Sequence, residues 1–225
     1  NAIPNLTLSA SSNTICTGNS ATLTANGAAS YSWNPGALTG TSTVVSPTTT
    51  TTYTVDGSDG TCSATQTITL VVSPNATVTA SASSNTICAG SSATLTANGA
   101  STYTWNPGAL TGTTTVVTPT ITTTYTVDAD NGLGCITSTM VTVNVNSAPS
   151  LSIAATSTAL CTSGSVTLTA TGATSYTWNP TAATTASIVD APSVTTTYTV
   201  TGEDAIGCSS SQTITISVGT PSLTL

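Results

Sequence analysis

The sequence predicts an all-β protein built from small β-sandwiches in tandem, and three observations support this prediction. A motif of Tyr, Ser or Thr, Trp, Asn and Pro recurs about every 72 residues, so the 225-residue chain holds three copies of one unit. Thr, Val and Ile, which favour strands, are abundant. Apolar and polar residues alternate with a period of two, and no segment shows a helical period. A unit this long suits one sandwich better than one solenoid coil.

The alternation places the strands of each unit in order. In the first unit it is clear over residues 21–25, and the Asn26-Gly27 pair that follows predicts a turn. Tyr31 and Trp33 share one face of the next strand, and residues 68–72 alternate again in the last. Equivalent segments recur in the other two units. The predicted core of the chain is formed by Trp33, Trp105, Trp178, Tyr53, Tyr125 and Tyr198.

The repeat also predicts the domain boundaries. Short links near Ser73-Pro74-Asn75 and near residues 146–149 separate the units. The last five residues, Pro221–Leu225, match Pro149–Ile153 at the opening of the third unit, so a further unit is expected to begin there. The predicted domains are residues 1–74, 75–147 and 148–219, with residues 220–225 as the start of a further repeat.

Composition excludes several classes of function. The chain has no Lys, Arg or His and seven Asp and Glu, for a formal net charge of −7. Nucleic-acid binding depends on Lys and Arg, and so does attraction to an anionic membrane surface, so neither partner is expected for this segment. Imidazole catalysis, lysine nucleophiles and histidine metal sites are impossible here. We therefore predict that the chain is not an enzyme, with no catalytic residue and no cofactor.

Six cysteines, two in each unit, indicate disulfides and an oxidising compartment, because no closely spaced set of four zinc ligands exists. Two pairings remain open. Base rates favour bonds within a unit. In a simple sandwich, however, the two cysteines of a unit lie at opposite ends, too far apart for a bond. The within-unit pairing is Cys16–Cys62, Cys88–Cys135 and Cys161–Cys208. The between-unit pairing is Cys16–Cys135 and Cys88–Cys208, with Cys62 and Cys161 bonded to repeats outside the chain.

The unit resembles a known family of modules. The resemblance rests on Cys88-Ala89-Gly90-Ser91, Tyr103–Pro107, Thr124–Val127 and Asn131–Cys135, with their counterparts in the other units. Together they are similar to the immunoglobulin-like (PKD-like) surface repeats of Bacteroidota, associated with gliding-motility adhesins and type IX secretion. The resemblance covers all three units. It implies tandem immunoglobulin-like β-sandwiches arranged as a linear rod, an exported protein, and an adhesion or scaffold role.

Carboxylates gather at equivalent turns of the three units and are weak candidates for Ca²⁺ binding. Their spacing differs between units, and two carboxylates per turn are few, so ordinary turn chemistry is the favoured interpretation. Repetition of the pair in every small unit also argues against a glycosidase. The candidates are Asp56, Asp59, Asp128, Asp130, Glu203 and Asp204.

These observations predict a structural stalk or fibre segment of a large extracellular or cell-surface adhesin or filament. Its expected partners are neighbouring repeats of the same chain or like chains in a fibre, and possible targets are glycans or a host surface. Two alternatives stay open. The chain is a glycan-binding module, or it is the spacer of a secreted multidomain enzyme.

Overall fold

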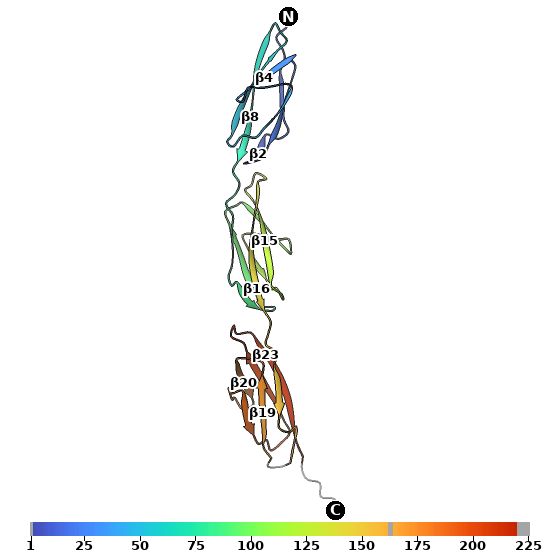
Figure 1. Cartoon of the computed structure of the whole chain (residues 1–225), viewed down its shortest axis with the longest axis vertical. Helices are drawn as coiled ribbons and strands as arrows, with labels where there is room; N and C mark the ends of the chain where they lie inside the picture. The colour runs from blue at the N-terminus through green and yellow to red at the C-terminus, as the bar shows by residue number, and fades with distance from the viewer. Residues whose placement is uncertain (1, 162–163, 220–225) are drawn as a thin grey trace, which may run out of the picture. The chain divides into compact units, whose positions relative to one another are not determined.

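The structure, a computed structural model, describes residues 2–161 and 164–219. Every regular element in this part of the chain is a β-strand (Figure 1). No helix within these residues has the length and apolar character needed to cross a membrane. The predicted start of a further repeat, residues 220–225, lies outside the described residues. Below, repeats 1, 2 and 3 are residues 1–74, 75–147 and 148–219, which are the boundaries that the sequence predicts.

Repeat 1 contains eight strands. They are β1 (Thr7–Ala10), β2 (Thr14–Cys16), β3 (Ala21–Asn26), β4 (Ser30–Asn34), β5 (Leu38–Thr39), β6 (Ser42–Val45), β7 (Thr51–Ser58) and β8 (Ser63–Ser73).

Repeat 2 has the same series. Its strands are β9 (Thr79–Ala82), β10 (Thr86–Cys88), β11 (Ala93–Asn98), β12 (Thr102–Asn106), β13 (Leu110–Thr111), β14 (Thr114–Val117), β15 (Thr123–Asp130) and β16 (Ile136–Asn146).

Repeat 3 has seven strands among the described residues, without a counterpart of β5. They are β17 (Ser152–Ala155), β18 (Ala159–Cys161), β19 (Val166–Thr171), β20 (Ser175–Asn179), β21 (Ser187–Asp190), β22 (Thr196–Glu203) and β23 (Ser209–Gly219).

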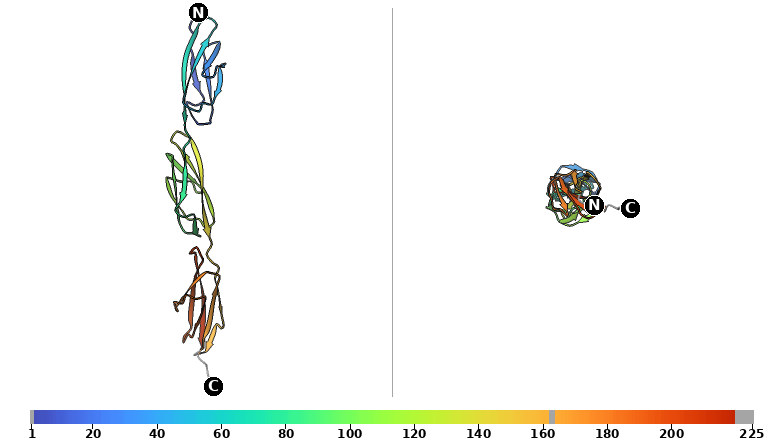
Figure 2. Two further views of the ribbon diagram at one scale, coloured as in Figure 1. Left: turned by 60° about the vertical axis from the view of Figure 1, so that its left-hand side comes forward. Right: turned by 90° about the horizontal axis from the view of Figure 1, so that it is seen from below.

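Each repeat forms two sheets, which Figures 1 and 2 show as two layers. In repeat 1 the orders are β1-β3-β6 and β2-β8-β7-β4-β5. Neighbouring strands run antiparallel, except that β2 runs parallel to the end of β8, with Thr14 opposite Val71 and Cys16 opposite Ser73. The chain therefore changes sheets between β1 and β2, and the first cysteine of the repeat lies beside the last residue of its last strand. The same parallel pairing recurs in repeats 2 and 3.

The core of each sandwich lies where the alternation predicts it. In β3, Ala21, Leu23 and Ala25 are buried and the threonines between them are not. Trp33 and its equivalents Trp105 and Trp178 have at most 1% of their surface exposed. Their indole N–H groups donate to the carbonyl oxygens of Gly40, Gly112 and Thr185 at 3.0–3.1 Å. The buried indole is therefore hydrogen-bonded within its own repeat, as a buried polar group requires.

A tight backbone contact closes each sandwich after β3 and its equivalents. Gly27 has φ = +101°, a conformation that only glycine adopts readily. A β-carbon at this position would lie 2.0 Å from the carbonyl oxygen of Asn5. Gly99 and Gly172 repeat this geometry against Thr77 and Ser150. At the turn predicted from Asn26-Gly27, the segment that enters the repeat at Asn5 thus packs directly against the backbone of Gly27.

The chain divides into two compact units, and the division passes through repeat 2. The first unit comprises Asn1–Ser81, Leu95–Thr115 and Tyr125–Val141, and the second comprises Ala82–Thr94, Val116–Thr124 and Thr142–Leu225. The first unit contains the junction between repeats 1 and 2. The second contains the junction between repeats 2 and 3.

Candidate functional site: the junctions between repeats

Disulfides join consecutive repeats. Cys16, the last residue of β2, is bonded to Cys135, which immediately precedes β16, and the two Cα atoms are 5.5 Å apart. Cys88, the last residue of β10, is bonded to Cys208, which immediately precedes β23, with the same Cα separation. Cys135 and Cys208 are each only 1% exposed. In both bonds the first cysteine of one repeat is linked to the second cysteine of the next, which is the between-unit alternative that the sequence left open.

The within-unit pairing that base rates favoured is therefore wrong. Its bonds Cys16–Cys62, Cys88–Cys135 and Cys161–Cys208 are incompatible with the bonds observed. The reason is the length of the last strand. Cys16 lies opposite Ser73, at the end of β8, whereas Cys62 precedes the start of β8, which is 11 residues long. Such a strand covers roughly 33 Å, and a disulfide needs Cα atoms within about 7 Å.

Polar contacts accompany the first disulfide. The Asn131 side-chain amide donates to the Ser73 hydroxyl at 2.7 Å and to the Pro74 carbonyl oxygen at 2.9 Å. The side-chain oxygen of Asn131, Oδ1, accepts from the backbone N–H groups of Leu133 and Cys135. Ser73 is only 2% exposed. One side chain of repeat 2 thus holds both the end of repeat 1 and the loop that carries Cys135.

The second junction uses the same two positions with the donor on the other side. Asn146, equivalent to Ser73, donates from its side-chain amide to the carboxylate of Asp204, equivalent to Asn131. The other Asp204 oxygen accepts from the backbone N–H groups of Ile206 and Cys208, each at 2.9 Å. In both junctions an amide spans the gap, and a side-chain oxygen of the next repeat fixes the loop that carries the cysteine.

Backbone hydrogen bonds lower the pKa values of two of the turn carboxylates, Asp59 in repeat 1 and Asp204 at the second junction. The N–H groups of Cys62 and Thr61 hold the pKa of Asp59 below its ordinary value. The N–H of Cys208 does the same for the pKa of Asp204, assisted by the N–H groups of Ile206 and Gly207 and by Asn146 against a smaller opposing effect of desolvation. Both carboxylates are therefore ionised at neutral pH and stabilise their turns as acceptors.

The remaining Ca²⁺ candidates have similar local roles. Asp56 accepts from the Thr65 hydroxyl and Asp128 from the Ser138 hydroxyl, each at 2.5 Å. Asp130 accepts from the N–H groups of Gly132 and Gly134. Glu203 is exposed at the end of β22. No group of three or more His, Cys, Asp or Glu side chains in the described part of the chain is placed to hold a metal ion.

The predicted core aromatics are buried. Tyr53, Tyr125 and Tyr198 are at most 6% exposed. In repeat 3 the Tyr198 hydroxyl donates to the Asp190 carboxylate at 2.5 Å, where repeats 1 and 2 have Val45 and Val117. Burial, followed by this hydrogen bond and the nearby negative charge, raises the pKa of Tyr198 to about 12. Burial also raises the pKa of Tyr53.

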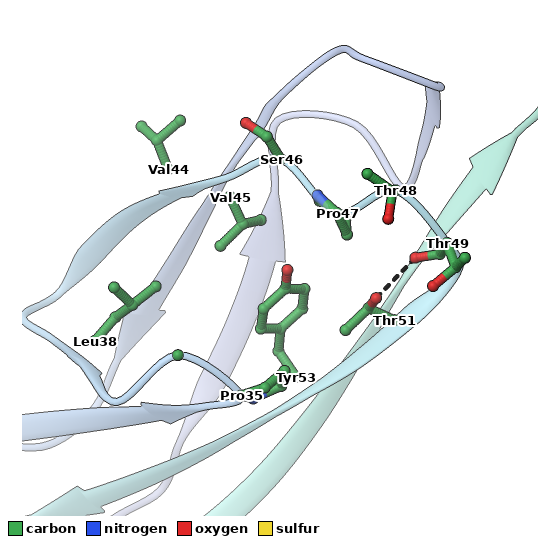
Figure 3. A pocket seen from close by; sticks show the side chains of 11 residues that line it. Pro35, Leu38, Val44, Val45, Ser46, Pro47, Thr48, Thr49, Thr51 and Tyr53 are labelled. Atoms are coloured by element: carbon green, nitrogen blue, oxygen red, sulfur yellow. Dashed lines mark hydrogen bonds between the residues drawn. The ribbon is translucent and has the colours of Figure 1, made fainter.

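A pocket of about 450 Å³ opens beside Tyr53 in repeat 1 (Figure 3). The Tyr53 ring rises from β7, and its hydroxyl points toward the segment that carries Ser46 and Pro47 (Figure 3). Thr51 donates to the Thr49 carbonyl oxygen at the rim. The lining combines hydroxyl groups with proline and aliphatic side chains and contains no charged group. The pocket could take a small neutral polyhydroxy group.

Sequence reasoning did not identify the role of the amides at the junctions. Asn131 opens the Asn131–Cys135 motif and Asn146 lies in a link, but their partners are 57 to 62 residues away in the chain. One signal was present in the sequence. The two equivalent positions carry Ser73 and Asn131 at the first junction and Asn146 and Asp204 at the second. In each pair, one residue has a side-chain amide that can donate and the other has a side-chain oxygen that can accept, but the amide changes sides.

No protein-family model matches the sequence, and no curated protein matches it. Among solved structures, the I67–I69 fragment of the titin I-band matches with a TM-score of 0.50 and 14% identity, over 98% of this chain and 99% of that one. The chain has the fold of tandem immunoglobulin-like domains. An E-to-A variant of the same titin domains gives 0.47 and 13% identity, over 93% and 95% of the two chains. A Ca²⁺-stabilized adhesin with which an Antarctic bacterium binds ice gives 0.41 and 17% identity, over 99% and 75%.

The cysteines depart from the usual immunoglobulin-like pattern. That pattern places one disulfide between the two sheets, with the second cysteine two residues after a conserved tyrosine. Here Val55 occupies that position after Tyr53, and it is completely buried. The immunoglobulin-like core of this chain is thus filled by aliphatic side chains, tryptophan and tyrosine. The cysteines lie at the ends of the repeats, where they can bond the neighbouring repeat.

Proposed function

We propose that the chain is a stretch of an extracellular stalk, in which disulfide-bonded immunoglobulin-like repeats hold a distant functional part away from a surface. The observation that carries this proposal is the pair of disulfides, Cys16–Cys135 and Cys88–Cys208, each of which joins one repeat to the next. Disulfides within a repeat would stabilise single sandwiches. Disulfides between repeats restrict how one repeat moves against the next, which benefits a stalk.

The surface chemistry supports the same proposal. Outward-facing threonines pair across strands, as in Thr52 with Thr69 and Thr197 with Thr215, whose hydroxyl oxygens are 2.9 Å apart. These threonine pairs are uncharged and hydrogen-bonded to each other, and the chain carries no Lys or Arg that could attract nucleic acid or anionic lipid. It suits a spacer that touches little along its length. Disulfides persist outside the reducing cytosol, which supports an extracellular location.

Three finer points belong to the proposal. The domains are the three predicted repeats, they lie end to end as a rod, and the chain belongs to the surface modules of Bacteroidota that its sequence resembles. The partners are neighbouring repeats or like chains in a fibre, and the target surface is unassigned. The full-length gene tests the assignment directly. A secretion signal and further copies of the repeat are expected, and a gene that encodes a cytoplasmic protein would contradict it.

Small-angle X-ray scattering of the whole chain tests the mechanical part. The oxidised chain is expected to give the pair-distance distribution of an elongated, restricted particle. A variant that combines Cys16→Ser, Cys135→Ser, Cys88→Ser and Cys208→Ser should sample bent arrangements, with a smaller mean radius of gyration. Cys161→Ser is the matched control, since Cys161 is exposed and is not in a disulfide in the structure. Identical profiles for the quadruple variant and the control would argue against a restraining role.

One observation favours a second candidate, a glycan-binding module. The pocket beside Tyr53 offers hydroxyl groups and an aromatic ring without charge, which is chemistry suited to a neutral sugar. Glycan-array binding that Thr48→Val, at an exposed lining residue, abolishes and Thr41→Val, at an exposed residue outside the pocket, retains would support it. The third candidate, a spacer within a secreted enzyme, would show itself as a catalytic domain encoded in the same gene.

A further inference from the structure

The two disulfides interleave along the sequence. Their cysteines occur in the order Cys16, Cys88, Cys135 and Cys208, and the bonds join the first to the third and the second to the fourth. Each bond closes a long loop, with sequence separations of 119 and 120 residues. The two loops share the segment from Cys88 to Cys135. Between the outer cysteines the backbone therefore falls into three segments, residues 16–88, 88–135 and 135–208.

This order determines what a backbone cut does. If a peptide bond is hydrolysed in any one segment, the other two segments and the two disulfides still connect all four cysteines. If one bond is cut in each of two segments, the remaining segment and the two disulfides still connect them. Among single cuts in different segments, only the combination of three, one in each segment, separates the four bonded cysteines. The products would then be two disulfide-linked pairs, one held by Cys16–Cys135 and the other by Cys88–Cys208.

Other pairings lack this property. With disulfides inside each repeat, a single cut in the link between repeats would divide the chain. These links are also where a protease is expected to act, because exposed loops and linkers are the usual sites of nicking. Asn75 and Ser147, in the two links, are both exposed. The positions most open to attack are thus spanned by a disulfide.

We propose that the interleaved disulfides keep the chain a single covalent molecule after proteolytic cleavage of its backbone, so that up to two cuts in different segments are tolerated. The inference rests on the connectivity of the cysteines and not on the proposed stalk function, so each can fail without the other. Each cleavage consumes one water molecule across a peptide bond and leaves the disulfides unchanged. The chain itself supplies no chemical step.

The absence of Lys and Arg makes a sharp test possible, because each introduced lysine creates the only trypsin site in its segment. Asn75→Lys lies in the first segment, Ile121→Lys in the second and Ser147→Lys in the third. Ile121 is 73% exposed, so its replacement disturbs no core. Single, double and triple variants are digested in urea with a maleimide present, which allows cutting in unfolded chains and blocks thiol exchange. Masses are then measured under denaturing conditions, before and after reduction.

Before reduction, every single and double variant is expected to give one species with the mass of the same maleimide-treated variant before digestion plus one water for each cut. After reduction each should separate into the fragments that the cuts define. The triple variant should give two species before reduction, residues 1–75 with 122–147 and residues 76–121 with 148–225. Release of residues 1–75 from the single Asn75→Lys variant without reduction would overturn the proposal. Release of any fragment from a double variant without reduction would overturn it as well.

A matched control shows which bond holds each cut chain together. Asn75→Lys combined with Cys135→Ser keeps the cleavage site and the Cys88–Cys208 bond, but that bond does not span residue 75. This variant is expected to lose residues 1–75 without reduction. If it remains intact, another covalent link spans the first segment and the interleaved connectivity is wrong.

Discussion

The side-chain amide of Asn131 donates a hydrogen bond of 2.7 Å to the hydroxyl of Ser73, across the junction between repeats 1 and 2. Ser73 is the last residue of β8 and is buried. Asn131 lies four residues before Cys135, in the loop that brings that cysteine to Cys16. The contact therefore positions the two parts of the chain that the disulfide joins.

Asn131→Asp should weaken the first junction. The substitution keeps the oxygen that accepts from Leu133 and Cys135, and the Ser73 hydroxyl can turn to donate to the new carboxylate. It removes the donor to the Pro74 carbonyl oxygen, so that a carboxylate oxygen faces that carbonyl without a hydrogen bond. A loss of about 1 kcal/mol in local stability is expected, measured as faster amide exchange in the 131–135 loop. Adding Ser73→Asn rebuilds the pair found at the second junction and should restore protection. Asn98→Asp, at an exposed turn, is the control. An unchanged exchange rate in Asn131→Asp would show that the contact is dispensable.

Removal of one disulfide should lower stability in the unit that contains it. Cys16→Ser with Cys135→Ser opens a loop of 119 residues and should reduce the free energy of unfolding by about 2–4 kcal/mol, mainly by increasing the entropy of the unfolded chain. Urea denaturation followed by tryptophan fluorescence measures it. The control Cys161→Ser should leave the transition unchanged. Equal midpoints for the paired variant and the control would contradict the prediction.

Trp33→Ala should unfold or strongly destabilise repeat 1 alone. The indole is 1% exposed, and its removal leaves a cavity in a small core, at a cost of about 3–5 kcal/mol. Trp33→Phe keeps much of the volume but loses the hydrogen bond to Gly40, so a smaller loss is expected. Hydrogen exchange should show lost protection in β3, β4 and β7 and normal protection in repeat 3. Equal loss in repeat 3 would mean that the sandwiches do not fold separately.

Acid should weaken the second junction through Asp204. Its pKa is lower in the folded chain than its ordinary value of 3.8, mainly because the Cys208 N–H stabilises the carboxylate. The stabilisation is therefore complete above the ordinary pKa and is lost as the pH falls through the lower folded value. Thermal unfolding of repeat 3, followed between neutral pH and strong acid, should show this decline. Asp204→Asn should have a flatter acid limb, and an unchanged limb would exclude Asp204 as its source.

Alkali should act on repeat 3 through Tyr198. Burial and the contact with Asp190 raise its pKa from 10.0 to about 12, so the neutral phenol is favoured in the folded chain. The corresponding stability is present below pH 10 and is lost as the pH rises toward 12 and beyond. Ultraviolet titration should show a late step that includes Tyr198, and Tyr198→Phe should reduce it while the raised pKa of Tyr53 keeps its own contribution. A late step of unchanged amplitude in Tyr198→Phe would assign all of it to other tyrosines.

Much of the fold could be predicted because it follows from local pattern. The period-two alternation around Leu23 places β3, and spacing alone identifies Trp33 as the core residue of its repeat. Burial of Ile15 beside β8 was not foreseen, because strand β2 has only three residues and pairs with a strand more than fifty residues later. The parallel pairing of β2 with β8 separates Cys16 from Cys62, so the disulfide choice depended on topology that the sequence does not encode locally.

The hydrogen bonds between repeats could not be predicted from the sequence. Asn131 contacts Ser73 only because two repeats meet, and neither side chain has a local pattern that reveals the other. Asp190 is a similar case. From the sequence it is one carboxylate apart from the turn clusters, and only the register of β21 against β19 places it where the other repeats have valine, within reach of Tyr198.

The close approach at Gly27, Gly99 and Gly172 has a consequence for how such sequences diverge. Many surface threonines of a strand can drift to serine, valine or alanine at little cost. A methyl group at the glycine would collide with a backbone carbonyl oxygen about 2 Å away. In a longer series of these modules, this one position should stay constant while its surroundings drift. The glycine therefore offers a reference position for recognising and aligning remote copies whose other residues have diverged.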